Sequence, residues 1–257
     1  MNPAALAEKV RAAAVEVLAG RGLDSTVLPE SVDLRRPRNP AHGDYSTSLP
    51  LRVGDRAGMS APDLARMLAS RLTGCDGIDS AEAAGAGFVN LRLTTAALTS
   101  VVADIEAAGE RYGARPHVPG AWQDVPADLR ERRIRDNPVF NVRYAHARIC
   151  QVVHNSVKFG MDPACADLGL LTHEREGAVI RALGEFEVLA PDLVARYLEQ
   201  LADALHGWYD TPECRILPQG DEEVAAVHLA RLRLSRAVRQ VLANGLEALG
   251  VSAPERM

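Results

Sequence analysis

Lysine is almost absent from this sequence of 257 residues: Lys9 and Lys158 are the only lysines among 29 basic residues. A phosphate-binding loop of the G-x-x-x-x-G-K type needs a lysine directly after a glycine, and no such segment occurs. The G-x-S-x-G turn that presents a nucleophilic serine is absent as well. From the residues alone we expect no catalytic site.

Cysteine is also sparse, and the cysteines lie far apart along the chain. A structural zinc site needs close pairs such as C-x-x-C, and no such pair is present. We therefore expect no metal, no cofactor and no disulfide framework. The four cysteines are Cys75, Cys150, Cys165 and Cys214.

Long apolar runs are missing too. No segment approaches the length that crosses a membrane, and the N-terminal segment carries Glu8 instead of a secretory signal. We expect a cytoplasmic protein that does not associate with membranes. Hydrophobic residues make up 47% of the chain and charged residues 25%, which is typical of a globular protein with one large domain or two ordinary ones.

The net charge of −5 does not indicate a nucleic-acid partner, yet the arginines gather at three places. Binding depends on where the cations cluster more than on the charge of the whole chain. A solvated surface is the alternative interpretation of each cluster. The clusters are Arg35, Arg36 and Arg38; Arg130, Arg132, Arg133 and Arg135; and Arg231, Arg233, Arg236 and Arg239.

The first half of the chain has the pattern of a small mixed α+β domain, over residues 1–112. Ser60, followed by Pro62 and Asp63, is typical of a helix start. In the segment 88–93, Phe88 and Asn90 share one face of a strand because side chains alternate along it. The expected helices cover 3–18, 60–72 and 95–108, and the expected strands cover 28–34, 78–83 and 88–93.

The second half, residues 137–257, has the pattern of an all-α helical bundle. Prolines and glycines interrupt residues 113–136, which we interpret as a linker with a short helical turn before its arginines. Within it, residues 115–126 are the expected first site of cleavage by a gentle protease. The expected helices cover 138–159, 168–186, 191–209 and 222–249.

Four segments of the chain resemble arginyl-tRNA synthetases. RPRNPAHGDYSTSLPL (residues 36–51) and AGAGFVNLRL (84–93) are similar to the N-terminal additional domain of that family. NPVFNVRYAHARIC (137–150) and AVRQVLANGLEALGVSAPERM (237–257) are similar to the two ends of its DALR anticodon-binding domain. The resemblance implies an α+β domain followed by a helical anticodon-binding domain.

The family also has a large catalytic domain between these two parts. That domain carries a His-x-Gly-His signature and a Lys-Met-Ser-Lys-Ser loop, and neither occurs here. Only the linker stands in its place. The resemblance therefore implies a paralogue that does not activate arginine.

Two residues match the strand that contacts the tRNA D-loop in the family, namely Phe88 and Asn90. An aromatic ring can stack on an unstacked base while an amide recognises its edge. The alternative for Phe88 is a place in the hydrophobic core. The chain has Gly85 where some members of the family have a further amide.

Four residues match the family's anticodon pocket, which holds the middle base. Tyr144 and Arg148 lie four apart and so share one face of a helix. Tyr209 matches a tyrosine of a later helix, and Met257 matches the terminal residue, whose carboxylate can accept a hydrogen bond from the amine of cytosine. Packing between helices is the alternative for the two tyrosines.

The sequence departs from the family at several positions. Asn141 and Arg143 replace an aromatic residue and a glutamine where the anticodon domain joins the catalytic domain. Pro50 lies within a segment that is helical in the family, which puts that helix in doubt. Residues 213–215 are inserted after Tyr209.

These observations lead to a non-catalytic protein that binds tRNA, in particular the arginine isoacceptors, through D-loop and anticodon contacts. A partner enzyme or synthetase is a further expected partner. One alternative is a protein–protein adaptor or regulatory subunit that keeps the fold without binding RNA. Another is a subunit completed by a separate catalytic chain.

Overall fold

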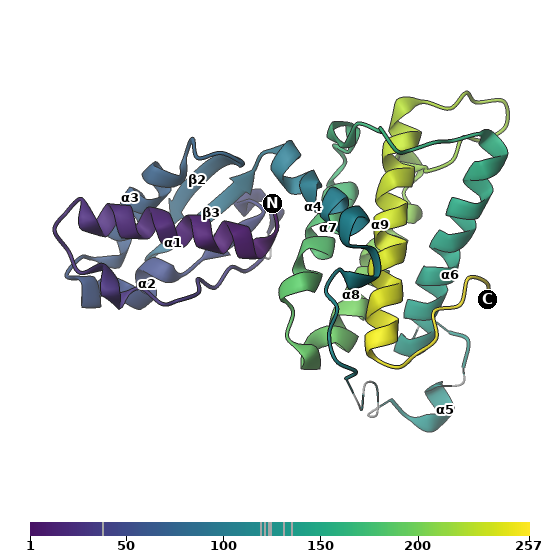
Figure 1. Ribbon diagram of the computed structural model, residues 1–257, viewed down its shortest axis with the longest axis horizontal. Helices are drawn as coiled ribbons and strands as arrows, with labels where there is room; N and C mark the ends of the chain where they lie inside the picture. The colour runs from purple at the N-terminus through teal and green to yellow at the C-terminus, as the bar shows by residue number, and fades with distance from the viewer. Residues whose placement is uncertain (38, 119, 121, 123–124, 131, 135) are drawn as a thin grey trace. The chain divides into compact units, whose positions relative to one another are not determined.

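The computed structural model describes residues 1–37, 39–118, 120, 122, 125–130, 132–134 and 136–257 (Figure 1). Internal packing divides the chain into two compact units, Met1–Leu98 and Thr99–Met257. Helix α4 (Thr95–Ala108) runs across this division. Residues 99–112, which we expected in the first domain, therefore belong with the second unit.

The first unit is a three-stranded antiparallel sheet covered by helices, as the α+β pattern predicts. Its strand order is β1-β3-β2, with β1 at Tyr45–Thr47, β2 at Ile78–Ala84 and β3 at Phe88–Leu93. Helix α3 (Ala61–Leu72) packs on β2 and β3, and α1 (Pro3–Ala19) packs on α3. Alternate residues of β3 face the core, which confirms the predicted faces of this strand. The buried residues of β3 are Val89, Leu91 and Leu93.

Local capping explains where the helices of this unit begin. The Asn2 side chain accepts a hydrogen bond from the amide of Ala5 at the start of α1. At the start of α3, Ser60 accepts one from the amide of Asp63 at 3.2 Å, as predicted. Each bond satisfies an amide that has no partner within its helix.

Two expectations for the first unit were wrong. Residues 28–34 form no strand: Leu28 and Val32 are buried, but the only pairing described nearby is an isolated bridge between Arg35 and Ser46. Apolar spacing indicated burial of this segment, but Arg35, just after it, makes only this one bridge to the edge strand β1. Helix α2 (Leu49–Val53) does form, because Pro50 lies in its first turn, where no amide donor is required.

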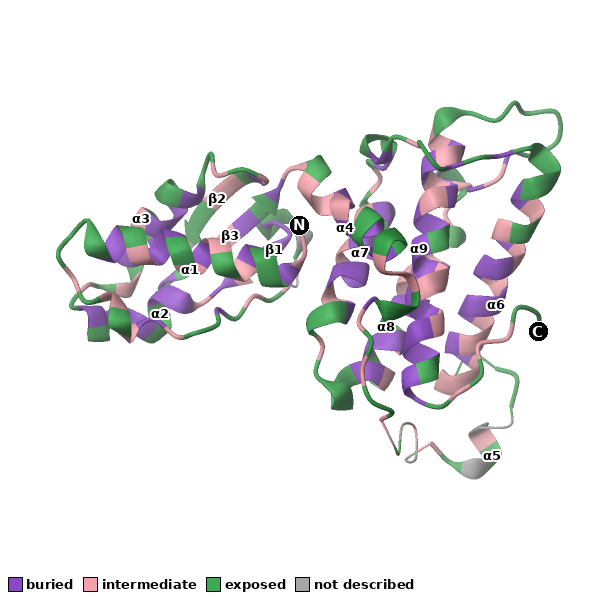
Figure 2. Cartoon of the chain, in the orientation of Figure 1, coloured by how far each residue is buried: buried purple, intermediate pink, exposed green. Residues whose placement is uncertain are grey.

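The second unit is an all-α bundle. Helix α9 contacts the other three long helices, and α8 contacts both α6 and α7, so the core lies among all four (Figures 1 and 2). Trp208 on α8 is fully buried there. The helices are α5 (Ala127–Arg130), α6 (Pro138–Ser156), α7 (Glu174–Glu185), α8 (Val194–Tyr209) and α9 (Ala226–Ala248).

The expected helix over 168–186 is shorter in the structure. It begins at Glu174 because His173 caps it, accepting from the amide of Arg175 at 3.1 Å while the Glu176 carboxylate accepts from the His173 amide at 2.9 Å. Residues Leu168–Leu170 form a separate 3-10 turn. Similarly, α9 begins at Ala226 rather than at 222.

The N-terminal part of the predicted linker lies on the helical unit. Arg115 donates hydrogen bonds to the carbonyl oxygens of Phe186 and Leu189. The amide of Val118 donates to the carbonyl of Ala248 at 2.8 Å, and the Trp122 indole donates to Glu199 at 2.6 Å. These contacts hold Arg115, Val118 and Trp122 against the bundle.

Candidate functional site

A pocket of about 220 Å³ opens in the helical unit. It lies between α6, the end of α8, the loop that follows α8, and the C-terminal tail. All four residues predicted for the anticodon site line it, so the structure brings together positions up to 113 residues apart in sequence. The lining residues are Tyr144, Ala147, Arg148, Gln151, Val152, Asn155, Tyr209, Leu217 and Met257.

Helix α6 supplies most of the polar wall. Tyr144, Arg148, Gln151 and Asn155 follow one another at intervals of three or four residues, which places them on one face of the helix. Gln151 and Asn155 were not predicted, although this spacing from Tyr144 indicates them. Tyr209 is the last residue of α8, and it reaches the same pocket because α8 packs against α6.

Arg148 lies at the centre of the site. Its guanidinium is 3.7 Å from the centroid of the Tyr209 ring and 6.0 Å from that of Tyr144. It also donates to the Asp210 carboxylate at 2.7 Å and lies 3.2 Å from Nδ1 of His206. A cation over an aromatic face is attracted by the ring quadrupole, so Arg148 holds Tyr209 in place from one side.

The contact between Arg148 and His206 defines the state of the histidine. An arginine is always a donor, so Nδ1 of His206 must be the acceptor. A neutral ring then carries its proton on Nε2. The ring also stacks on Tyr144 with centroids 5.7 Å apart, and Tyr144 stacks in turn on Phe140 at 5.7 Å. Tyr144 is thus fixed on both sides, while Tyr209 is 36% exposed.

The C-terminal tail is fastened along α6 by hydrogen bonds. Nδ1 of His146 lies 2.9 Å from the carbonyl of Pro254, and Gln151 donates to the carbonyl of Glu255 at 3.1 Å. Because a carbonyl only accepts, Nδ1 of His146 carries a proton. Burial lowers the pKa of His146, chiefly because the charged ring would lose its hydration. The fastened tail brings Met257 into the pocket.

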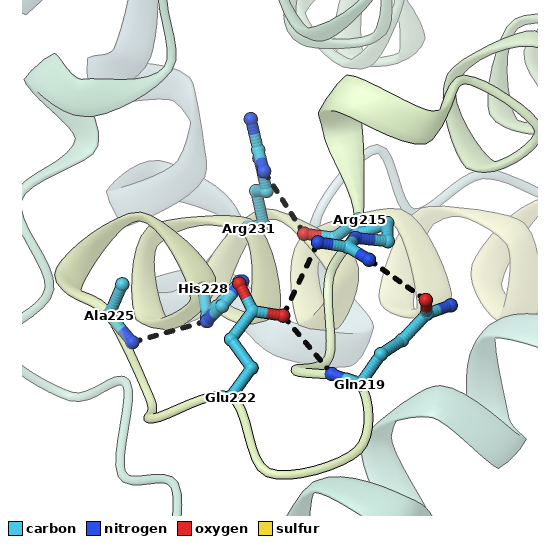
Figure 3. A network of polar contacts seen from close by, with 6 residues as sticks. All are labelled: Arg215, Gln219, Glu222, Ala225, His228 and Arg231. Carbon is cyan, nitrogen blue, oxygen red and sulfur yellow. Dashed lines mark hydrogen bonds and ion pairs between the residues drawn. The ribbon is translucent and has the colours of Figure 1, made fainter.

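The loop after α8 is held by the polar network drawn in Figure 3. Glu222 accepts hydrogen bonds from the Arg215 guanidinium at 3.3 Å and from the Gln219 amide at 3.1 Å. Arg231 of α9 donates to the Arg215 carbonyl at 3.0 Å. This network positions Leu217, which the sequence did not indicate because the loop has no regular periodicity.

A second pocket, of about 200 Å³, adjoins the first at this loop. The two pockets share Val152, Tyr209 and Leu217 as walls. Arg215 and Gln219 line only the second one. The Tyr209 ring is therefore accessible from two hollows.

The first unit carries the other predicted site on the outer face of β3. Phe88 is 44% exposed, so its alternative place in the core is wrong. Asn90 is half-buried and lines a shallow hollow of about 40 Å³ with His42, Gly43 and Arg92. Gly43 has φ of 103°, and a side chain there would begin 2.6 Å from the Leu91 carbonyl. Glycine therefore allows the segment 41–44 to approach β3 closely.

The arginine clusters differ in their surroundings. Arg231 and Arg233 pair with Glu176 and Glu106 inside the helical unit, so they stabilise the bundle. Arg132 and Arg133 are exposed. Two members of the predicted clusters, Arg38 and Arg135, lie outside the described residues.

The described ranges contain no cluster of three or more histidine, cysteine, aspartate or glutamate side chains able to bind a metal ion. Within those same ranges, no helix has the length and apolar character needed to cross a membrane.

Comparisons with known proteins match both units. Residues 2–93 match the arginyl tRNA synthetase N terminal domain, and residues 142–257 match the DALR anticodon binding domain. An arginine–tRNA ligase of Clavibacter sepedonicus is 49% identical over 142 residues, which cover 52% of this chain and 25% of that protein. The match thus spans about a quarter of the length of this relative.

A crystal structure assigned as an arginyl-tRNA synthetase of Campylobacter jejuni is also similar. It is 20% identical, and the match covers 51% of this chain and 29% of that one with a TM-score of 0.40.

Proposed function

We propose that this chain, whose two units match domains of arginyl-tRNA synthetases, binds tRNA and recognises an anticodon base in the pocket beside Tyr144 and Tyr209. The observation that carries the proposal is the convergence of Tyr144, Arg148, Tyr209 and Met257 on one pocket. A DALR domain is named for anticodon binding, and the matched residues 142–257 include all four of these side chains.

The chemistry of the pocket suits a nucleobase removed from its stack. Tyr209 offers an aromatic face, and its ring is oriented by Arg148 at 3.7 Å. Gln151 and Asn155 add amide groups that can pair with the edge of a base. Stacking on such a ring contributes roughly 1–3 kcal/mol per base. We propose the cytosine at the middle of the arginine anticodon as this base.

The N-terminal unit supplies a second contact in this proposal. Phe88 presents an exposed ring on the same face of β3 as Asn90, so the ring is available to a ligand. We propose that the ring stacks on a base of the D-loop while Asn90 pairs with its edge.

We further propose that the chain does not activate arginine. The matched domains leave only residues 94–141 between them, and much of that segment forms α4 and contacts on the helical unit. No lysine lies in it. Carefully purified protein is expected to show no arginine-dependent exchange of pyrophosphate into ATP, and exchange at the rate of a complete synthetase would contradict the proposal.

Binding itself is tested by titrating fluorescent arginine tRNA with wild-type protein, Tyr209→Ala and Phe159→Ala. Phe159 is a matched control because it is an exposed aromatic of the same unit that lines neither pocket. We expect Tyr209→Ala to weaken binding by roughly 1–3 kcal/mol and Phe159→Ala to leave it unchanged. Equal losses, or no binding by the wild type, would favour the adaptor that keeps the fold without RNA.

A further inference from the structure

A larger hollow, of about 470 Å³, lies beside the pocket at Tyr144 and Tyr209, which we call the base pocket. This hollow is rich in arginine. Four of the residues that line it are arginines, and of the described side chains in its wall none is acidic. Arg132 and Arg133 precede α6, Arg143 lies on α6, and Arg256 comes from the C-terminal tail. Three separate segments of the chain thus bring positive charge to one cavity.

Among the described residues, no acidic side chain pairs with these arginines. Within the part of the chain that the structure describes, none of the four forms an ion pair, unlike Arg231 and Arg233 of the bundle. Like charges that share a cavity repel one another. An anion bound in the cavity would remove that cost.

Arg143 gives a second, independent indication of a ligand. One terminal nitrogen donates to the Ser252 hydroxyl at 3.2 Å, but its buried Nε has no hydrogen-bond partner. A buried donor without a partner is unfavourable, and a phosphate oxygen is a strong acceptor for a guanidinium.

The location specifies which anion. The hollow shares Met257 with the base pocket, and Arg143 directly precedes Tyr144. The hollow also lies at the N-terminus of the long helix α6, whose dipole favours negative charge. The tail is anchored by His146, so Arg256 and Met257 are held at the junction between the two cavities. A nucleotide with its base in the first pocket has its backbone within reach of the second.

We propose that Arg132, Arg133, Arg143 and Arg256 form a phosphate site for the RNA backbone next to the base held at Tyr144 and Tyr209. The inference rests on the proposed function and extends it. Arg132 and Arg133, which lie between the two matched domains, then contribute directly to RNA binding.

The test compares the salt dependence of binding for wild type, R132Q/R133Q and the control R196Q. Arg196 is an exposed arginine on α8 outside this cavity. Each lost phosphate contact lowers the slope of log K against log salt by about 0.7 for a single strand. We expect a decrease of about 1.4 for the double variant, a decrease of about 0.7 for R143Q, and no change for R196Q. Equal decreases in all variants, or none, would overturn the phosphate site.

An anticodon stem-loop without its middle base separates this proposal from the preceding one. The backbone site still binds that probe, and R132Q/R133Q still weakens it, even if the base pocket shows no preference among bases. If wild type binds no RNA but inorganic tripolyphosphate raises its melting temperature, the arginines bind another anion and the RNA assignment is wrong.

Discussion

Replacement of Arg148 by alanine removes three contacts at once from the centre of the candidate site. The cation over the Tyr209 ring, at 3.7 Å, contributes about 0.5–2 kcal/mol. The pair with Asp210 is half-exposed and adds at most about 1 kcal/mol. The hydrogen bond to His206 adds about 1 kcal/mol. We expect the variant to lose about 2–3 kcal/mol of unfolding free energy.

The assay uses tryptophan fluorescence during denaturation by urea. Both tryptophans, Trp122 and Trp208, belong to the second unit, so the signal reports on that unit alone. Arg148→Lys should recover only part of the loss, because an ammonium lacks the planar, forked geometry of the guanidinium. Full recovery by lysine, or a loss below about 0.5 kcal/mol in the alanine variant, would refute the role of Arg148 in holding Tyr209.

Two further predictions concern the helical unit. Glu176 is fully buried and pairs with Arg231 at 2.6 Å, so Glu176→Gln leaves the buried charge of Arg231 unpaired. The variant should lose about 3–5 kcal/mol of unfolding free energy in the same fluorescence assay. An unchanged denaturation midpoint would contradict the pairing. Burial lowers the pKa of His146 below its ordinary value, so the unfolded chain takes up the proton first as the pH falls. Stability should be independent of this group above about pH 6.5 and should decrease below it, and His146→Gln should remove part of that decrease; an identical pH profile in the variant would refute it.

Local patterns predicted much of the fold. The bounds of α4 and the strands β2 and β3 follow from periodicity and from the glycines between the strands, since Gly85 and Gly87 have φ of 54° and 143°. The strand predicted over 28–34 was wrong because the spacing of its apolar residues reflects the burial of Leu28 and Val32 and does not establish pairing with a strand. The start of α7 depended on a reciprocal cap between His173 and Glu176.

The candidate site divides in the same way. Tyr144 and Arg148 share a helix face, which spacing alone can indicate. Leu217 enters the pocket from an irregular loop held by Glu222, and no local sequence pattern predicts its place there. The hydrogen bond between His146 and Pro254 determines the path of the tail, and it joins positions 108 apart in the chain. The cavity lined by Arg132, Arg133, Arg143 and Arg256 was not predicted either, because its walls come from segments far apart in the sequence.

The central claim is that the pocket beside Tyr209 recognises the middle base of the anticodon. The most direct measurement compares the Kd values of two tRNA transcripts that differ only in that base, cytosine or uracil, for wild type and Tyr209→Ala at one salt concentration. We predict that wild type prefers cytosine by roughly 1–3 kcal/mol and that the preference decreases markedly in the variant. Equal Kd values for the two transcripts with the wild-type protein would contradict the claim.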